Sequence, residues 1–201
     1  MNNKITFGIG GIVVGVIITL LVSPMLQSGS MMSGQKISNK NQMMGNIDKH
    51  FIEQMIPHHE GAVAMAKLAL LKSKRPEVKT LATAIIKDQN KEIGDMTVWY
   101  KDWFGNDVPK VSGGMMGGGM MSSSGMHMGG QEDMSSLENA ADFDKAFLEA
   151  MIPHHQLALM MVTMLESGSS RPEMLQLAKN ITASQSKEIQ QMQAWYTQWY
   201  K

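Results

Sequence analysis

Apolar residues recur at spacings of three and four positions in two neighbouring segments, which is the pattern of amphipathic helices. The first stripe consists of Phe51, Met55, His59, Ala62, Ala66 and Ala69. The second consists of Val78, Ala82, Ile85, Gln89, Glu92, Met96, Trp99 and Trp103. Pro76 and Glu77 stand between the stripes, and both residue types suit the first turn of a helix. So short a connection predicts an antiparallel helical hairpin.

The sequence Met-Ile-Pro-His-His occurs at residues 55–59 and again at residues 151–155, 96 positions later. Other pairs share this offset: Phe51 and Phe147, Gln89 and Gln185, Glu92 and Glu188, Met96 and Met192, Trp99 and Trp195, Trp103 and Trp199. A register kept over such a length indicates one folding unit used twice. Since two helices alone cannot bury their apolar faces, we expect an all-α fold in which the two hairpins form a four-helix bundle.

Residues 5–22 form an apolar run without a charged side chain. Eighteen helical residues would span roughly 27 Å, close to the thickness of a bilayer's hydrocarbon core. The run therefore predicts an N-terminal membrane helix in residues 1–22. A cleaved signal peptide is the alternative, although residues 22–25 contain no Ala-x-Ala pattern. Under both interpretations the rest of the chain is exported.

Composition divides the remainder of the chain. We expect a flexible Met-containing tether at 23–46, the first hairpin at 47–104, a Gly/Met-rich linker at 105–136 and the second hairpin at 137–201. Segments so rich in glycine cannot build a core, so packing does not explain their methionines. Because exposed methionine is open to oxidation, a ligand role is the better explanation.

Composition also excludes several functions. The chain has no cysteine, which rules out disulfides, thiolate metal sites and cysteine nucleophiles. Its formal net charge of zero argues against nucleic acid as a partner. It has 22 methionines, and methionine either fills gaps in a core or serves as a soft thioether ligand.

Proline and histidine both interrupt the first helical stripe of each copy. Pro57 and Pro153 should kink the helix or start a new one. Each is followed by two histidines, and four of the six histidines of the chain lie in these two pairs. Met55, His58 and Met65 fall within about 80° of one another around a helix, which favours a ligand role over a core role.

The second stripe contains Gln89 and Glu92, although a buried carboxylate needs a partner charge or a metal. With the centre of the turn near residue 74, His59 should lie level with Gln89, and Met55 level with Glu92. The alternative is a carboxylate paired with lysine on a solvated face. In each hairpin, the histidine pair of the first helix and the Gln and Glu of the second helix are thus expected to lie close together.

Imidazole together with thioether selects soft or borderline ions, so the pattern favours Cu(I), with Cu(II) and Ag(I) as alternatives. The main candidate ligands are His58, His59, Met55 and Met65, and in the second copy His154, His155, Met151 and Met161. The secondary candidates are Glu92, Met96, Glu188 and Met192. Whether each hairpin holds its own ion or both share a site is left open by the pattern.

The Met-Ile-Pro-His-His motif, followed by Gln-x-x-Glu-Ile-x-x-Met-x-x-Trp at 89–99 and 185–195, resembles the domain-of-unknown-function 305 family. The resemblance implies an exported, ferritin-like helical bundle, and some members of the family are associated with copper binding and resistance. Glu60 is replaced by Gln156 in the second copy, so this position receives no ligand role.

The resulting hypothesis is a copper-binding protein that sequesters or delivers the ion in copper homeostasis. It would be anchored through residues 5–22 and face the periplasm or the cell exterior, or be soluble if the segment is cleaved. A copper transporter or chaperone is the expected partner. The alternative is a ferritin-like di-metal oxidoreductase, but such sites use Glu-x-x-His, and Glu53 and Glu149 stand five residues before the histidines. A purely structural bundle would not explain the methionines of the linker.

Overall fold

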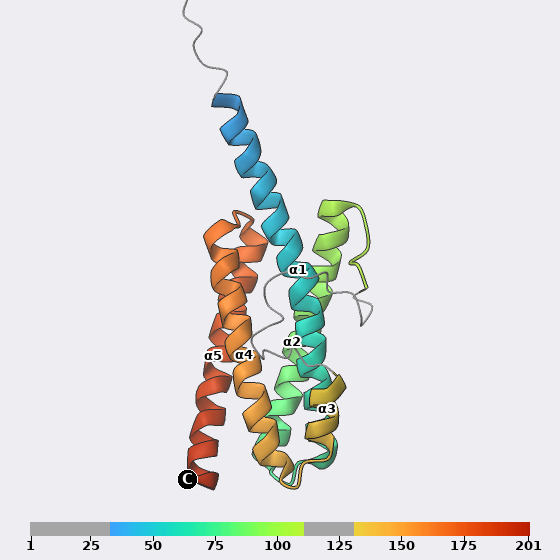
Figure 1. The fold of residues 1–201 in the computed structure, drawn as a ribbon, viewed down its shortest axis with the longest axis vertical. Helices are drawn as coiled ribbons and strands as arrows, with labels where there is room; N and C mark the ends of the chain where they lie inside the picture. Colours follow the sequence, from blue (N-terminus) through green and yellow to red (C-terminus); the bar gives the residue numbers. More distant parts are fainter. Residues whose placement is uncertain (1–32, 111–130) are drawn as a thin grey trace, which may run out of the picture.

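The computed structural model describes residues 33–110 and 131–201, with side chains from 47–110 and 134–201. These residues form five helices and no strand (Figure 1). The helices are α1 (Ser33–Lys72), α2 (Pro76–Phe104), α3 (Gln131–Glu138), α4 (Phe143–Gly168) and α5 (Pro172–Tyr200).

The four long helices pack as pairs. α1 contacts α2 and α4 contacts α5, each across a short turn, and the two hairpins meet where α1 packs against α4. α1 and α4 run in opposite directions, as Figure 1 shows. The prediction of an all-helical fold built from two hairpins is thereby confirmed.

The helix ends follow from the residues that occupy them. Pro76 and Pro172 begin α2 and α5 after an arginine in extended conformation. Asp142 caps α4 by accepting a hydrogen bond from the backbone N–H of Lys145. α2 ends at Gly105, whose φ of 73° lies in the left-handed region that glycine adopts without strain.

Pro57 and Pro153 lie inside α1 and α4, so neither helix begins at its proline. Of the two expected outcomes, a new helix start is therefore wrong, and the stripe continues from Phe51 past the histidines. Met55 and Ile56 are buried directly before Pro57, and this packing offsets the backbone hydrogen bond that the proline removes.

Two helical segments fall where composition predicts flexible chain. The backbone is helical from Ser33, inside the predicted tether at 23–46, and α3 lies largely in the predicted linker at 105–136. A helix that is already nucleated extends readily through Lys, Gln and Met, and Leu137 of α3 is buried in a core cluster to which both hairpins contribute.

The predicted anchor or signal at 1–22 and most of the Met-rich linker lie outside the described residues. Within the described ranges, none of the helices combines the length and apolar character that a bilayer crossing requires.

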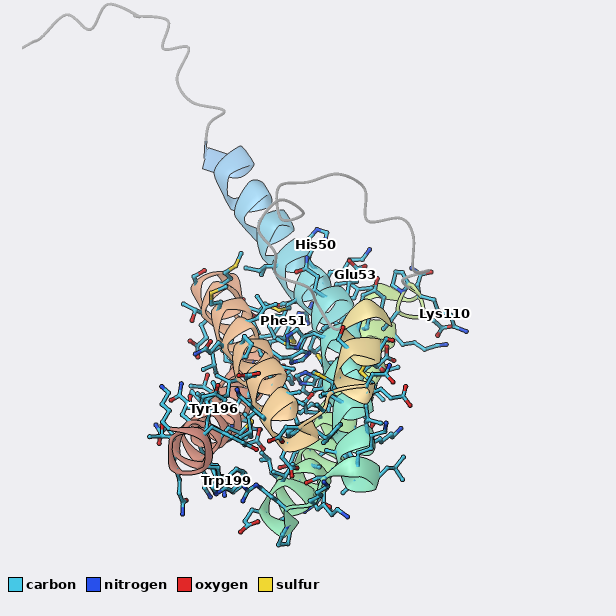
Figure 2. All side chains as sticks on the ribbon, turned by 60° about the horizontal axis from the view of Figure 1, so that its bottom comes forward. His50, Phe51, Glu53, Lys110, Tyr196 and Trp199 are labelled. Carbon is cyan, nitrogen blue, oxygen red and sulfur yellow. The ribbon has the colours of Figure 1, made fainter. Side chains whose placement is uncertain are left out.

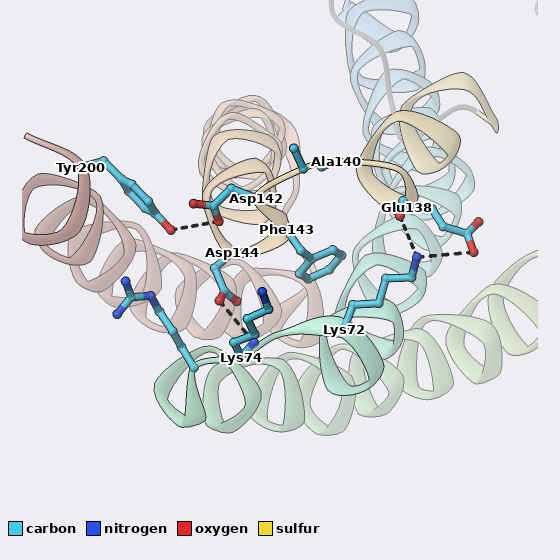
Figure 3. Close-up of a pocket in the computed structure, with 10 residues that line it drawn as sticks. Lys72, Lys74, Glu138, Ala140, Asp142, Phe143, Asp144 and Tyr200 are labelled. Carbon is cyan, nitrogen blue, oxygen red and sulfur yellow. Dashed lines mark hydrogen bonds and ion pairs between the residues drawn. The ribbon is translucent and has the colours of Figure 1, made fainter.

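An aspartate near the start of each hairpin holds the turn of the other hairpin. Asp144 accepts a hydrogen bond from the Ser73 hydroxyl. It also accepts one, at 3.2 Å, from the backbone N–H of Lys74, as Figure 3 shows. Its counterpart Asp48 forms an ion pair with Arg171 at 3.0 Å. These reciprocal contacts give the two repeats an approximate two-fold relation.

The repeated arginines and tryptophans also join the hairpins. Arg75 lies over the ring of Trp199, with 3.8 Å between guanidinium carbon and ring centroid, and Arg171 lies over Trp103 at 4.2 Å. Each of these tryptophans stacks on the tryptophan four residues before it, with centroids 5.4 and 5.7 Å apart. Arg75 and Arg171, which share the 96-residue offset, thus make contacts between the hairpins rather than within them.

A candidate metal centre

The two histidine pairs form one row across the contact between α1 and α4. The ring centroids of His58 and His154 lie 3.7 Å apart, with 37° between the ring planes. His59 lies 6.2 Å beyond His58, and His155 lies 6.3 Å beyond His154. All four rings are buried. The histidines that the sequence places in separate hairpins thus meet at the centre of the molecule.

The outer histidines are held by carboxylates of the second helix of each hairpin. His59 Nε2 donates a hydrogen bond to Glu92 at 2.7 Å, and His155 Nε2 donates to Glu188 at 2.7 Å. An ionised carboxylate only accepts, so each Nε2 carries a proton, and in the neutral tautomer that makes this contact Nδ1 is left with the lone pair. Neither Nδ1 has a hydrogen-bond partner. Metal-binding histidines are commonly oriented by a carboxylate in this way.

The inner histidines have no hydrogen-bond partner at either ring nitrogen. Burial, aided by the neighbouring imidazoles, lowers the pKa of His58 to about 3 and the pKa of His154 to about 2. Both rings are therefore neutral at physiological pH and keep a lone pair for a ligand bond. Unsatisfied buried nitrogens cost folding free energy, so their presence calls for an explanation such as an ion.

The residue of α2 that faces His59 lies one helical turn away from the predicted one. His59 was expected to face Gln89, but it contacts Glu92 instead, one turn further along α2. Helical side chains lean toward the N-terminus of their own helix, so in an antiparallel pair the two side chains lean in opposite directions. Gln89 and Gln185 are buried nearby, and Gln89 Oε1 and both amide atoms of Gln185 have no partner.

The buried methionines divide into two groups, each drawn from both hairpins. One group, which we name the Met161 cluster, consists of Met55, Met96, Met161 and Met174. The other, the Met65 cluster, consists of Met65, Met151 and Met192, with the half-buried Met134 of α3 packed against it.

The structure separates two residues that the sequence grouped into one site. Met55 and Met65 lie on the same side of α1, but ten residues of helix separate them by roughly 15 Å. Two residues can share an angle around a helix and still lie far apart along its axis, so the shared angle does not bring their side chains together. Met174 was missed altogether; the only sequence signal is that it replaces Val78 of the first repeat.

Other acidic residues near the motif have different partners. Glu53 and Glu149 accept hydrogen bonds from the hydroxyls of Tyr100 and Tyr196, both at 2.6 Å. Figure 2 labels Glu53 on α1 and Tyr196 on α5. Among the residues that the structure describes, no group of three or more His, Asp or Glu side chains is arranged to hold a metal. A site at the histidine row would therefore draw on thioethers as well.

Comparison with known proteins places the chain in a family. A family model described as a domain of unknown function (DUF305) matches residues 48–196. The chain belongs to the DUF305 family. One curated relative is the uncharacterized protein L153 of Acanthamoeba polyphaga mimivirus, which is 45% identical over 49 residues, or 24% of this chain. That match spans 32% of the viral protein's length.

Solved structures cover more of the chain. CopM in its Cu(I)-bound form is 44% identical, with a TM-score of 0.66 over 77% of this chain and 98% of CopM. CopM structures in Ag-bound and Cu(II)-bound forms match at 42% identity. A DUF305 protein of Streptomyces coelicolor, described as a candidate secreted protein, is 26% identical with a TM-score of 0.63, over 76% of this chain and 93% of that one.

Proposed function

We propose that this DUF305 protein binds copper outside the cytoplasm and sequesters or delivers it in copper homeostasis. Cu(I) is the favoured ion, with Cu(II) and Ag(I) as alternatives. The observation that carries the proposal is the buried row of four imidazoles, whose free nitrogens lie between two clusters of thioethers. The similarity to CopM, whose structures contain Cu(I), Cu(II) or Ag, supports the same ion class for this chain.

The ligands would come from both hairpins. His58 and His154 would contribute at the centre of the row, and His59 and His155 through Nδ1. Thioethers would come from the Met161 cluster at one side and the Met65 cluster at the other. Glu92 and Glu188 would orient the outer histidines rather than bind the ion, because their carboxylates already accept from Nε2.

The ligand types explain the choice of ion. Neutral imidazole and thioether are ligands for soft and borderline ions, whereas hard ions require oxygen. The absence of thiolates suits an oxidising compartment. The proposal assigns binding and transfer of an ion, and no reaction; a di-metal oxidoreductase is less well supported, because Glu53 and Glu149 are engaged by tyrosines.

The remaining parts of the chain complete the proposal. The hairpins at 47–104 and 137–201 would form a ferritin-like bundle, attached to the membrane through residues 1–22 unless that segment is a cleaved signal. Methionines of the tether at 23–46 and of the linker at 105–136 would capture ions weakly and raise their local concentration. A membrane copper transporter or a copper chaperone would be the partner.

Metal binding by the full chain, purified in mild detergent, tests this function. The protein would be incubated with Cu(I), Ag(I), Zn(II) or Fe(II) and dialysed against a chelator that strips weakly held ions. We expect retained copper or silver, and loss of that fraction when His58, His59, His154 and His155 are changed to alanine. His50→Ala is the matched control, because His50 is exposed and pairs only with Glu53.

Retention of two iron ions per chain, or copper retention that is the same in both variants, would contradict the proposal. Circular dichroism of each variant would show whether the helical fold is kept. If the variant with all four histidines changed unfolds, the same retention measurement on the single variants His59→Ala and His155→Ala would show whether the histidines hold the ion.

A further inference from the structure

Two methionines on the outer face of α4 have no counterpart in the first repeat. Met160 is 49% exposed and Met164 is 61% exposed. The equivalent positions of α1 are Ala64 and Leu68, which carry no sulfur. Neither methionine belongs to a core cluster, so packing does not account for them. The pair is a departure from the approximate two-fold relation between the hairpins.

Their spacing suits a single soft ion. Residues four apart on a helix have Cβ atoms about 5–6 Å from each other on one face, so two flexible thioethers can reach an ion between them. The hydroxyls nearby are engaged with backbone: Ser167 donates to the Met164 carbonyl at 2.7 Å and Thr163 to the Leu159 carbonyl at 3.0 Å. The pair thus offers sulfur, which selects Cu(I) or Ag(I).

Met160 and Met164 lie next to the buried Met161 on the surface of α4. With 3.6 residues per turn, Met160, Met164 and Met161 follow one another around α4 at about 0°, 40° and 100°. Their exposed fractions are 49%, 61% and 9%, so the series passes from solvent into the core. Met161 packs in the cluster that contains Met55 and Met96. Methionine sulfur is therefore present at each step from the surface to the vicinity of the histidine row.

In the part of the chain that the structure describes, the opposite end of the molecule has no such series. Met65 is the counterpart of Met161, but its neighbours Ala64 and Leu68 provide no thioether. Met134 packs against the Met65 cluster from α3, and the positions three and four residues away on its helix are occupied by Gln131, Leu137 and Glu138. It therefore has no second thioether on its own helix with which to chelate an ion.

We propose that Met160 and Met164 together bind a Cu(I) or Ag(I) ion at the surface of α4 and pass it through Met161 into the Met161 cluster. That cluster then fills before the Met65 cluster. The surface site stands independently, whereas its loading role rests on the proposed function.

The surface site is tested by NMR of the full chain in mild detergent, with ¹³C-labelled methionine methyl groups and Ag(I) as a redox-stable probe. We expect the Met160 and Met164 methyl resonances to shift together along one binding curve. In Met160→Leu, the affinity reported by Met164 should fall at least about tenfold, because chelation is lost. An unchanged Met164 curve would mean independent, adventitious contacts and would overturn the site. Both positions are exposed, so the substitutions do not endanger the fold.

The loading role is tested by tryptophan fluorescence during rapid mixing with Ag(I). The four tryptophans of the chain divide between the ends: Trp99 and Trp103 pack against the Met161 cluster, and Trp195 and Trp199 against the Met65 cluster. Changing either pair to phenylalanine leaves a reporter for one end. We expect the Met161 end to respond about tenfold faster, consistent with a higher local ion concentration.

The two repeats supply the control variants. Met160→Ala with Met164→Leu gives α4 the residues of α1 and should slow only the Met161 end. Ala64→Met with Leu68→Met should accelerate only the Met65 end. Equal rates at both ends of the unaltered protein would overturn the loading role. If neither end responds to Ag(I) at all, the proposed function fails instead, and the NMR result still decides the surface site.

Discussion

At the scale of single residues, Glu92 determines which nitrogen of His59 carries the proton. The carboxylate lies at 2.7 Å from Nε2 and is 12% exposed, so it connects a fully buried ring to the protein surface. Glu188 has the same distance and the same exposure in the second hairpin. The carboxylates keep Nδ1 free, and this is the property that a metal-binding histidine requires.

We therefore predict that Glu92→Gln weakens Ag(I) or Cu(I) binding by about 10- to 100-fold without unfolding the protein. A glutamine amide can still hydrogen-bond the ring, but it no longer imposes the proton on Nε2. Competition with a chelator of known affinity measures the change. Glu60→Gln is the control, because Gln156 already occupies the equivalent exposed position of the second repeat. An equal loss in both variants would contradict the orienting role.

His58 and His154 make the metal-free protein sensitive to acid. Their pKa values are lowered by burial to about 3 and about 2, from about 6.5 in the unfolded chain. Below pH 6.5 the unfolded state binds more protons than the folded state, so the free energy of unfolding falls as the pH is lowered. This contribution is fully present above pH 6.5, and its slope approaches about 1.4 kcal/mol per pH unit for each histidine.

Urea denaturation of the metal-free protein at pH 7, 6 and 5 measures this slope. The variant His58→Leu with His154→Leu should show a flatter dependence, since leucine does not titrate. Equal unfolding free energies of the unaltered protein at pH 7 and pH 5 would show that the two rings do not stay neutral.

At the scale of helices, the turns of the hairpins are held from outside. Asp144 at the start of α4 is buried and accepts from the turn between α1 and α2. We predict that Asp144→Ala lowers the free energy of unfolding by about 1–3 kcal/mol, because the Ser73 hydroxyl loses a buried partner. Urea denaturation at pH 7 measures the loss. Asp102→Ala, on the exposed face of α2, is the control and should change the free energy of unfolding by less than about 0.5 kcal/mol. A loss as large as that of Asp144→Ala would argue against a stabilising contact between Asp144 and the turn.

At the scale of the whole molecule, function depends on the contact between hairpins. Each methionine cluster and the inner histidine pair take residues from both repeats. A single hairpin would therefore lack part of every group. The repeats differ at many individual positions, and one of these differences, the exposed pair Met160 and Met164, distinguishes the two ends of the molecule at the surface.

The sequence by itself determined the helices of the two hairpins, their pairing and most residues of chemical interest. Apolar spacing, the prolines that begin the second helix of each hairpin and the 96-residue repeat are local or one-dimensional signals, so they can be recognised without coordinates. Imidazole and thioether types likewise define the class of ion. The resemblance of the Met-Ile-Pro-His-His motif to the DUF305 family is confirmed by the family model that matches residues 48–196.

Only the tertiary structure decided how these residues combine. The contact of His58 with His154, and the grouping of Met161 with Met55 of the other hairpin, depend on how α4 packs against α1. That packing depends on long-range contacts over the whole apolar surface. The helical pattern of the sequence, in contrast, gives only the angle and spacing of residues within each helix. For the same reason the sequence left open whether the two repeats share a site, and the structure brings their histidines into one row.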